Sequence, residues 1–276
     1  MSKTARLSGG ALMLLAASLP AQETQTADEI AQELSNPVGS LASLVFQGTY
    51  TQWDGSAPGI SDQNTSALIF MPTLPFKLAG GNLVVRPSFP FAGAPVPNSS
   101  GGWDKVSGFG DIVLLANWGK KTESGIIWSF GGTAIFPTAS DPALGADQWQ
   151  VGPAAILALL RRWGVVGAMW QHWWGLNTPE GGGAKANTGT LQLFYWFSMG
   201  GGWQVGGSPI PTANYVTATE TDFTVPINLG AAKTFILGSM PLKATLQGQY
   251  FLTRPEVAGP SWGVFFQITP VVKVLW

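Results

Sequence analysis

The sequence predicts an all-β protein: a transmembrane, antiparallel, up-and-down β-barrel of about 12 strands with a short N-terminal helical lead-in. Three observations predict this fold. Apolar and polar residues alternate with a period of two from Leu41 onward, charged residues make up only 11% of the 276-residue chain, and it contains 13 Trp. Alternation of this kind is typical of strands whose two faces meet different surroundings. So few charges indicate that much of the outer surface does not face water.

The first 21 residues have the features of an export signal. Lys3 and Arg6 precede a short apolar run, Ala11–Leu19, and a small residue, Ala21, offers a cleavage site. The run is shorter than the roughly 20 residues that a transmembrane helix needs. A buried N-terminal helix is the alternative interpretation. We expect residues 1–21 to direct export, and the barrel to lie in the outer membrane of a Gram-negative cell.

Residues 22–40 are predicted to be a periplasmic lead-in, partly helical. Ala27, Ile30, Ala31 and Leu34 recur at helical spacing, and Asn36–Pro37 ends the pattern. We expect a short, exposed segment. A plug for the barrel or a helix that binds a partner is the alternative.

Residues 41–276 are predicted to form the barrel. Short connections rich in Gly or charge alternate with longer ones such as Ala92–Gly108, which is the arrangement of outer-membrane barrels. An even number of strands places both ends of the exported chain on the short-turn, periplasmic side. The expected strands cover residues 41–53, 63–75, 81–91, 109–120, 124–137, 146–160, 163–175, 187–199, 202–214, 221–234, 240–253 and 260–276.

A soluble β-sandwich also alternates, but two features favour the barrel. The strands span roughly 10 to 15 residues, which suits a tilted membrane crossing of about 9–11 better than soluble strands of about 5–6. The tryptophans gather near strand ends, as expected of the aromatic girdles at the two membrane interfaces. The predicted girdle consists of Trp53, Trp118, Trp149, Trp163, Trp173, Trp174, Trp203, Trp262 and Trp276.

The polar face of the strands is predicted to line the lumen. It is mostly amide and hydroxyl, which gives hydrogen bonds with little charge selectivity. The candidate lining residues are Arg86, Asp111, Asn117, Gln150, Gln171, Gln192, Asn228, Lys243, Gln247, Gln249 and Gln267. Apolar residues expected on the same face are Val84, Leu115, Ile135 and Phe265. The alternative is that these amides pair with one another in a closed interior.

Chemistry-bearing residues are scarce. The chain has no Cys and one histidine, His172, which shares its strand face with Trp170 and Trp174 and is expected to anchor the membrane interface. Asp141 and Asp147 share a loop without the spacing of an EF-hand. We therefore expect no enzyme activity, no cofactor and no metal site. The net charge of -1 gives no basic surface for nucleic acid.

Five stretches resemble a family of Gram-negative outer-membrane proteins grouped with the phenol-degradation meta-pathway, often labelled "transporter" or, in bacteria, "neuromedin U". They are Leu34–Gln47, Gly108–Asp111, Phe136–Pro153, Thr224–Lys233 and Trp262–Val271. The resemblance implies a barrel that passes small apolar or aromatic compounds, and it offers no catalytic residues. Resemblance to outer-membrane proteins more broadly implies that the aromatic end, Trp276, addresses the last strand to the barrel-assembly machinery.

Together these features predict a passive channel for small uncharged or apolar molecules, some of them aromatic. Its expected partners are outer-membrane lipid, a small-molecule solute and the assembly machinery. The alternative is a structural or assembly barrel with a closed lumen, which acts through its loops or the N-terminal segment.

Overall fold

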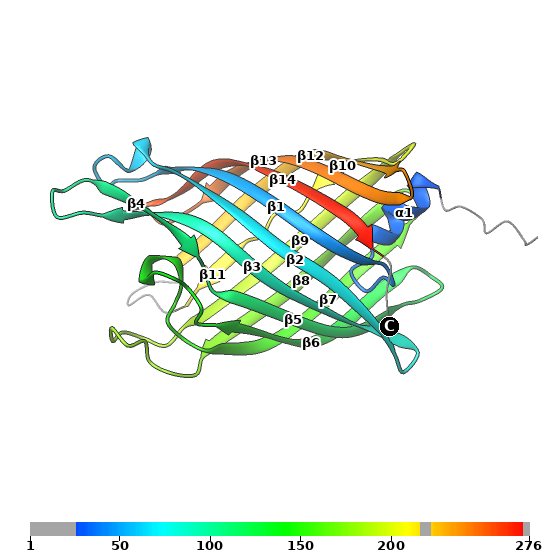
Figure 1. Cartoon of the computed structure of the whole chain (residues 1–276), viewed down its shortest axis with the longest axis horizontal. Helices are drawn as coiled ribbons and strands as arrows, with labels where there is room; N and C mark the ends of the chain where they lie inside the picture. The colour runs from blue at the N-terminus through cyan, green and yellow to red at the C-terminus, as the bar shows by residue number, and fades with distance from the viewer. Residues whose placement is uncertain (1–25, 216–221, 273–276) are drawn as a thin grey trace, which may run out of the picture.

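The computed structural model describes residues 26–215 and 222–272, and these form a closed antiparallel β-barrel of 12 strands (Figure 1). Consecutive strands are neighbours in the wall, and pairing of the last strand with the first closes the ring. The predicted fold, its up-and-down order and its strand number are confirmed.

The wall begins with β1 (Ala42–Asp54), β2 (Asn64–Leu78), β3 (Gly81–Pro97), β4 (Trp103–Phe109), β5 (Ile112–Lys121), β6 (Ile126–Phe136) and β7 (Gln150–Arg161). It continues with β8 (Gly164–Gly175), β9 (Asn187–Gly200), β10 (Trp203–Gly207), β11 (Thr212–Asn214), β12 (Asp222–Leu237), β13 (Met240–Thr253) and β14 (Gly259–Val272). The helical elements are α1 (Ala27–Leu34), η1 (Ile60–Asp62) and η2 (Pro142–Leu144).

Two of the 12 barrel strands are interrupted. β4 and β5 both pair with β3 and form one strand, while β10 and β11 both lie between β9 and β12. The predicted long loop at Ala92–Gly108 is therefore wrong. β3 continues to Pro97 and pairs with β4, so this connection is a β-hairpin that projects beyond the barrel (Figure 1). The single strand expected at 202–214 is split at its centre.

The alternation in the sequence separates the inner and outer faces of the wall. In β13, Leu246 and Tyr250 are 57% and 55% exposed on the outside, whereas Lys243 and Gln247 are 8% and 2% exposed on the inside. Apolar side chains of this kind are exposed around the whole ring, which suits contact with lipid hydrocarbon. Within residues 26–215 and 222–272, no helix is long and apolar enough to cross a membrane.

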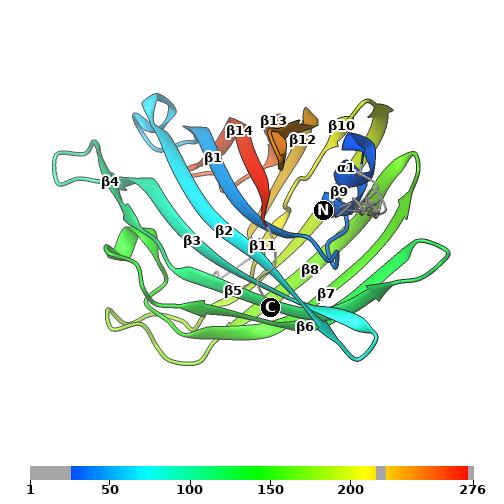
Figure 2. The same ribbon diagram turned by 45° about the vertical axis from the view of Figure 1, so that its right-hand side comes forward.

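The N-terminal segment packs into one end of the barrel, where Ile30, Ala31 and Val38 are buried, while Asp28 and Glu29 stay exposed as expected of a lead-in. α1 lies at the end that carries the short turns, here called the short-turn end (Figure 2). The opposite end, which carries η1, η2 and the β3–β4 hairpin, is called the loop end. Ile30 and Ala31 are only 3% and 2% exposed, because the helix packs its apolar side against the inner wall.

Candidate functional site

Ten of the eleven polar residues predicted to line the lumen occupy inward positions of their strands, and the eleventh, Asp111, lies in the break between β4 and β5. β8 illustrates the alternation: Gln171 is 8% exposed, and the adjacent Trp170 is 42% exposed on the outside. The most deeply buried of the set are Asn117, Gln150, Gln171, Asn228, Lys243 and Gln247. The others, which are half-buried, are Arg86, Asp111, Gln192, Gln249 and Gln267.

These side chains do not converge on a single filter, because several bond to neighbours on the wall. The Nη2 atom of Arg86 lies 3.2 Å from Met71 Sδ, and Asn117 donates to Ser129 Oγ at 3.3 Å. Inward Val84 and Leu115, 3% and 6% exposed, place apolar surface between the polar groups. The interior is therefore a mosaic of amides and aliphatic side chains.

Trp173 belongs to the interior, and its assignment to the outer girdle is wrong. It is 7% exposed, and its Nε1 donates to Thr133 Oγ1 at 3.1 Å, beside Gln171 Nε2, which donates to the same oxygen at 3.1 Å. The physical reason is the strand period of two. Trp173 and Trp174 are consecutive, so only one of them can face outward, and Trp174, 48% exposed, does so.

Thr133→Val should lower the free energy of unfolding by about 2–3 kcal/mol, because two buried N–H donors lose their shared acceptor. Urea titration in detergent, read from the heat-modifiable gel shift, measures the change. Thr190→Val is the matched control, since Thr190 pairs with Gln171 in register on the neighbouring strand. Equal losses for the two variants would show that Thr133 acts only through its shape.

The outer tryptophans form two belts. Trp118, Trp163 and Trp203 lie near the short-turn end, and Trp149, Trp174 and Trp262 near the loop end. The ammonium of Lys233 lies 5.0 Å from the ring centroid of Trp203, in a cation–π contact. An amphipathic ring at each water–lipid boundary is typical of membrane barrels. Trp128, 5.5 Å from the ring of Trp118, extends the belt, and the sequence analysis missed it.

Two predicted girdle residues are not part of these belts. Trp53 Nε1 donates to Thr65 Oγ1 at 3.0 Å, and Thr65 is buried on the inner face at 7% exposure. The ring of Trp53 therefore turns inward at the loop end, because Tyr50 takes the outward position and contacts Trp262. Trp276 lies outside the described residues.

His172 faces outward, as its parity with Trp170 and Trp174 predicted. Its ring lies 4.4 Å from that of Trp174 and 5.7 Å from that of Tyr215, and its Nε2 is 2.8 Å from Asn187 Oδ1. An amide oxygen and aromatic rings hold this histidine in place.

The helix α1 is tied to the short-turn end by two side chains, Gln32 and Asp28. Gln32 Nε2 donates to the carbonyl of Arg162, in the β7–β8 turn, at 3.2 Å. Asp28 accepts hydrogen bonds from the backbone N–H groups of Gly202 at 2.6 Å and Gly201 at 3.1 Å. Gly200, Gly201 and Gly202 all have positive φ angles, of 84°, 58° and 79°. Successive left-handed residues point their N–H groups at one spot, which makes an anion-binding nest that only glycine forms readily.

Residues after α1 cross the lumen. Val38, 2% exposed, packs in a cluster contributed by five strands of the wall: Ile127, Ala158, Leu160, Val165, Trp196 and Ala232. From the other side of the ring, Asn82 in β3 donates to the carbonyl of Val38 at 2.8 Å. Residues 27–39, which we call the plug, therefore obstruct the short-turn end.

The inner wall also holds the plug through Lys243. Its Nζ lies 3.4 Å from Ser35 Oγ and 5.6 Å from the ring centroid of Trp196, and Gln204 donates to the same Ser35 oxygen at 3.2 Å. The ammonium of Lys243 thus contacts Ser35 of the plug and the ring of Trp196. Sequence reasoning placed Lys243 inward but gave no sign of this partner.

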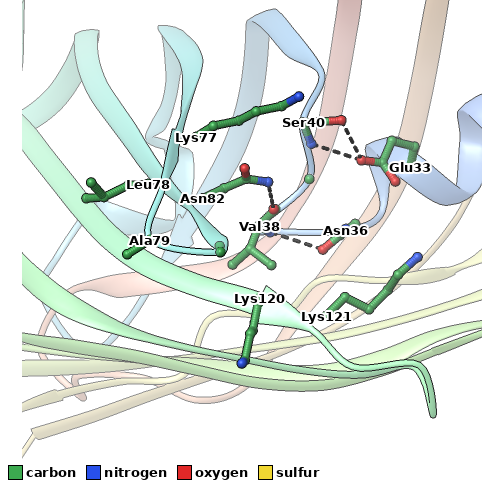
Figure 3. A pocket seen from close by; sticks show the side chains of 13 residues that line it. Glu33, Asn36, Val38, Ser40, Lys77, Leu78, Ala79, Asn82, Lys120 and Lys121 are labelled. Atoms are coloured by element: carbon green, nitrogen blue, oxygen red, sulfur yellow. Dashed lines mark hydrogen bonds between the residues drawn. The ribbon is translucent and has the colours of Figure 1, made fainter.

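A cavity of about 580 Å³ lies between the plug and the turns of β2–β3 and β5–β6 (Figure 3). Lys77, Lys120 and Lys121 line it together with Glu33 of α1, whose carboxylate accepts from Ser40 N at 2.9 Å. The cavity lies on the outer side of the plug, and its three lysines make its lining basic.

A second cavity, of about 480 Å³, occupies the loop end of the barrel interior. Its lining is mostly apolar or neutral and consists of Pro90, Ala92, Gly110, Asp111, Val113, Ile135, Leu144, Ala146, Gln150, Ala186, Thr188 and Asn214. Ile135 and Gln150 were predicted lumen residues, and the structure brings them together here. We call it the loop-end cavity.

Asp111 is the one ionisable residue in this lining, and its carboxylate accepts hydrogen bonds from backbone N–H groups. Oδ1 accepts from the N–H groups of Thr138 and Ala139, each at 3.0 Å, and Oδ2 accepts from Ala146 at 2.8 Å. Asp111 thereby folds the β6–β7 loop against the mouth. A Cβ at Gly145 would meet Asp111 Oδ1 at 2.6 Å, so glycine is needed for this approach.

The two loop aspartates considered for Ca²⁺ have separate structural roles. Asp141 Oδ1 accepts from Ala143 N at 2.9 Å and caps η2. Asp147 Oδ2 accepts from Glu180 N at 2.6 Å and joins two loops.

No protein-family model matches the chain, and no curated protein matches it. Among solved structures, the chain is similar to an outer membrane channel from Pseudomonas putida F1, with a TM-score of 0.62 and 16% identity over 84% of this chain and 94% of that chain. A second similar structure is the β-domain of the Bordetella autotransporter Brka, with a TM-score of 0.48, 15% identity, and coverage of 84% and 100%. At 16% identity, the likeness to the channel shows the fold. The grouping with the phenol-degradation family stays a prediction.

Proposed function

We propose that the protein is an outer-membrane channel that passively admits small uncharged or apolar molecules, aromatic ones included. The loop-end cavity carries this proposal. It opens among the loops and is lined by aliphatic and amide groups, and the carboxylate of Asp111 is already bonded to three N–H groups. A pocket of this chemistry suits solutes that lose little hydration on entry.

The outer surface supports the location in a membrane. Two tryptophan belts flank exposed Leu, Phe and Val side chains, which lipid hydrocarbon stabilises and water does not. The lipid is therefore a partner around the whole ring. No chemical step is part of the proposal, since the one histidine faces outward.

The test compares two fluorescent solutes that differ by one charge. N-phenyl-1-naphthylamine is uncharged, and 8-anilino-1-naphthalenesulfonate carries a sulfonate on the same ring system. Both are added to vesicles whose outer leaflet contains lipopolysaccharide, with and without the purified protein. We expect the protein to accelerate entry of the uncharged dye by a clearly larger factor. No acceleration of either dye would refute the channel, and a larger effect on the sulfonate would refute the solute class.

Ala92→Trp should slow entry of the uncharged dye by about tenfold, because an indole in the loop-end cavity needs to raise the barrier by only about 1.4 kcal/mol to do so. Ala116→Trp is the matched control. Ala116 lies on the outer face of β5, so its indole adds to the lipid-facing surface. An equal dye entry rate in both variants would mean that the cavity is not on the route.

A second candidate is a structural barrel with a closed lumen, and the plug favours it. In that case neither dye is accelerated, and removal of residues 27–39 abolishes binding of a protein partner while the barrel stays folded.

A further inference from the structure

Arg86 is a cationic side chain of the barrel interior whose charge has no anionic partner. It lies on the inner face of β3, and its Nε is buried without a hydrogen-bond acceptor. Its Nη2 lies 3.2 Å from Met71 Sδ, and a thioether is a weak acceptor. Within residues 26–215 and 222–272 Arg86 forms no ion pair, and the pair found there joins Arg254 to Asp54. The described part of the chain therefore leaves the charge of Arg86 uncompensated.

Asp111, the predicted lumen residue with a carboxylate, does not compensate this charge. It precedes Leu115, the residue opposite Arg86, by four positions, or roughly 13 Å of strand. Both of its carboxylate oxygens already accept from backbone N–H groups. The inward neighbours Val84 and Leu115 are aliphatic and buried. The wall around Arg86 thus offers a cation among largely uncharged side chains.

An arginine at such a position destabilises the protein unless it binds something. The guanidinium stays protonated in proteins, and a buried charge without a counter-charge is unfavourable. Ionisable groups inside membrane proteins are therefore rare, and they usually serve a ligand, an ion pathway or a partner charge. A neutral side chain such as Gln would fill the same inward position without this penalty. The arginine therefore points to an anion that comes from outside the chain.

The chemistry of that anion follows from the guanidinium and from the cavity beside it. The planar fork of a guanidinium matches the two oxygens of a carboxylate. Leu115, opposite Arg86, is two positions, or about 7 Å of strand, from Val113, which lines the loop-end cavity. The mostly apolar or neutral lining of this cavity suits an aliphatic or aromatic body. In the other direction along β3, Asn82 bonds to Val38, so Arg86 lies between the cavity and the plug.

We propose that Arg86 binds the carboxylate of an apolar monocarboxylic acid, whose body occupies the loop-end cavity. Met71 gives up Nη2 readily, because a Met side chain repacks with little strain and its sulfur bonds weakly. The inference rests on the proposed channel function and adds amphipathic anions to the ligands of the lumen. A carboxylate held at Arg86 stays in the lumen, so it occupies the route that an uncharged solute follows.

The binding test uses 1-naphthoate, with 1-naphthamide as its uncharged analogue and acetate as a carboxylate without an apolar body. Equilibrium dialysis of the detergent-purified full chain, against protein-free micelles of the same detergent, measures each affinity. We expect 1-naphthoate to bind at least about tenfold more tightly than either of the others. Equal binding of naphthoate and naphthamide would refute a role for the charge. Equal binding of naphthoate and acetate would refute the place of the body in the cavity.

Arg86→Gln should weaken naphthoate binding about tenfold and leave naphthamide binding unchanged, because it removes the charge and the fork. Lys120→Gln is the matched control. It also removes one positive charge, but from the short-turn end, where the ammonium lies 5.8 Å from the ring centroid of Trp128. Equal losses for the two variants would show that binding follows net charge alone, and would refute the site.

Stability distinguishes a ligand site from an arginine that holds the wall together. Without naphthoate, Arg86→Gln should unfold at the same or a higher urea concentration than the natural chain, because a buried charge without a partner is gone. Naphthoate should stabilise the natural chain and not the variant. The heat-modifiable gel shift reports both effects. Lower stability of the variant without ligand, or failure to fold, would overturn the inference.

Vesicles separate this inference from the channel itself. Naphthoate should slow entry of N-phenyl-1-naphthylamine through the natural chain, whereas Arg86→Gln should keep the dye entry and lose the slowing. Absence of accelerated dye entry without naphthoate would refute the channel and leave the binding result standing. Binding at Arg86 that never slows the dye would contradict a site on the route.

Discussion

Removal of residues 27–39 is expected to raise the single-channel conductance several-fold. These residues carry Val38 into the centre of an apolar cluster from five strands and bond to Asn82 on the other side of the ring. Ions that follow the barrel axis therefore meet the plug. Planar-bilayer recordings of the shortened and full chains measure the change, and the heat-modifiable gel shift checks that the shortened barrel folds.

The single substitution Asp28→Ala should give an intermediate conductance with frequent opening events. It removes two charge-assisted hydrogen bonds to Gly201 and Gly202, and a loss of about 2–3 kcal/mol changes the docked-to-undocked ratio roughly 30- to 150-fold. Glu123→Ala is the matched control, because Glu123 lies in the β5–β6 turn at the same end. Conductance equal to that of the full chain in both the deletion and Asp28→Ala would show that the plug does not limit ion passage.

Asp111→Ala is expected to release the β6–β7 loop from the mouth of the loop-end cavity. The carboxylate accepts from three N–H groups of that loop, and their joint loss should cost about 3 kcal/mol of local stability. Limited proteolysis of the detergent-purified protein measures this, as faster cleavage between Thr138 and Ala146. Dye entry should change with it, since Leu144 and Ala146 line the cavity.

Asp141→Ala is the control for this prediction. Asp141 lies in the same loop, but its side chain bonds to Ala143 within the loop rather than to the wall. Cleavage should therefore stay near the rate of the natural chain. Equal sensitivity of the two variants would mean that the loop is held by its packing and not by Asp111.

The strand pattern was predictable because it depends on local physics. In a two-sided wall, the residue type reports directly which side a position faces, so Lys243 and Gln247 could be placed inward against Leu246 and Tyr250 outward. The same rule, applied strictly, would also have turned Trp173 inward, because it is adjacent to Trp174. Tryptophan marks the membrane interface only at positions whose parity faces outward, and Trp173 is not one of them.

The plug and the split between β10 and β11 could not be derived in this way, because they depend on contacts distant in sequence. Asp28 and Gly202 are 174 positions apart, and the sequence around either residue does not indicate that the two are in contact. The split is marked locally by Pro209 and Pro211, but the position of Pro226 on the facing strand follows only once the register is known. The hairpin of β3 and β4 was missed because its Pro, Gly and Ser content is typical of a loop.

The glycine nest sets an order for folding. Asp28 has no binding site until the turn at Gly200–Gly202 has formed, and that turn is translated long after α1. Before that turn forms, the two N–H groups that bind Asp28 are not in place, so this anchor of α1 is absent. Docking of α1 through Asp28 is therefore a late step of folding, and Asp28→Ala would leave a complete barrel whose plug is docked for a smaller share of the time.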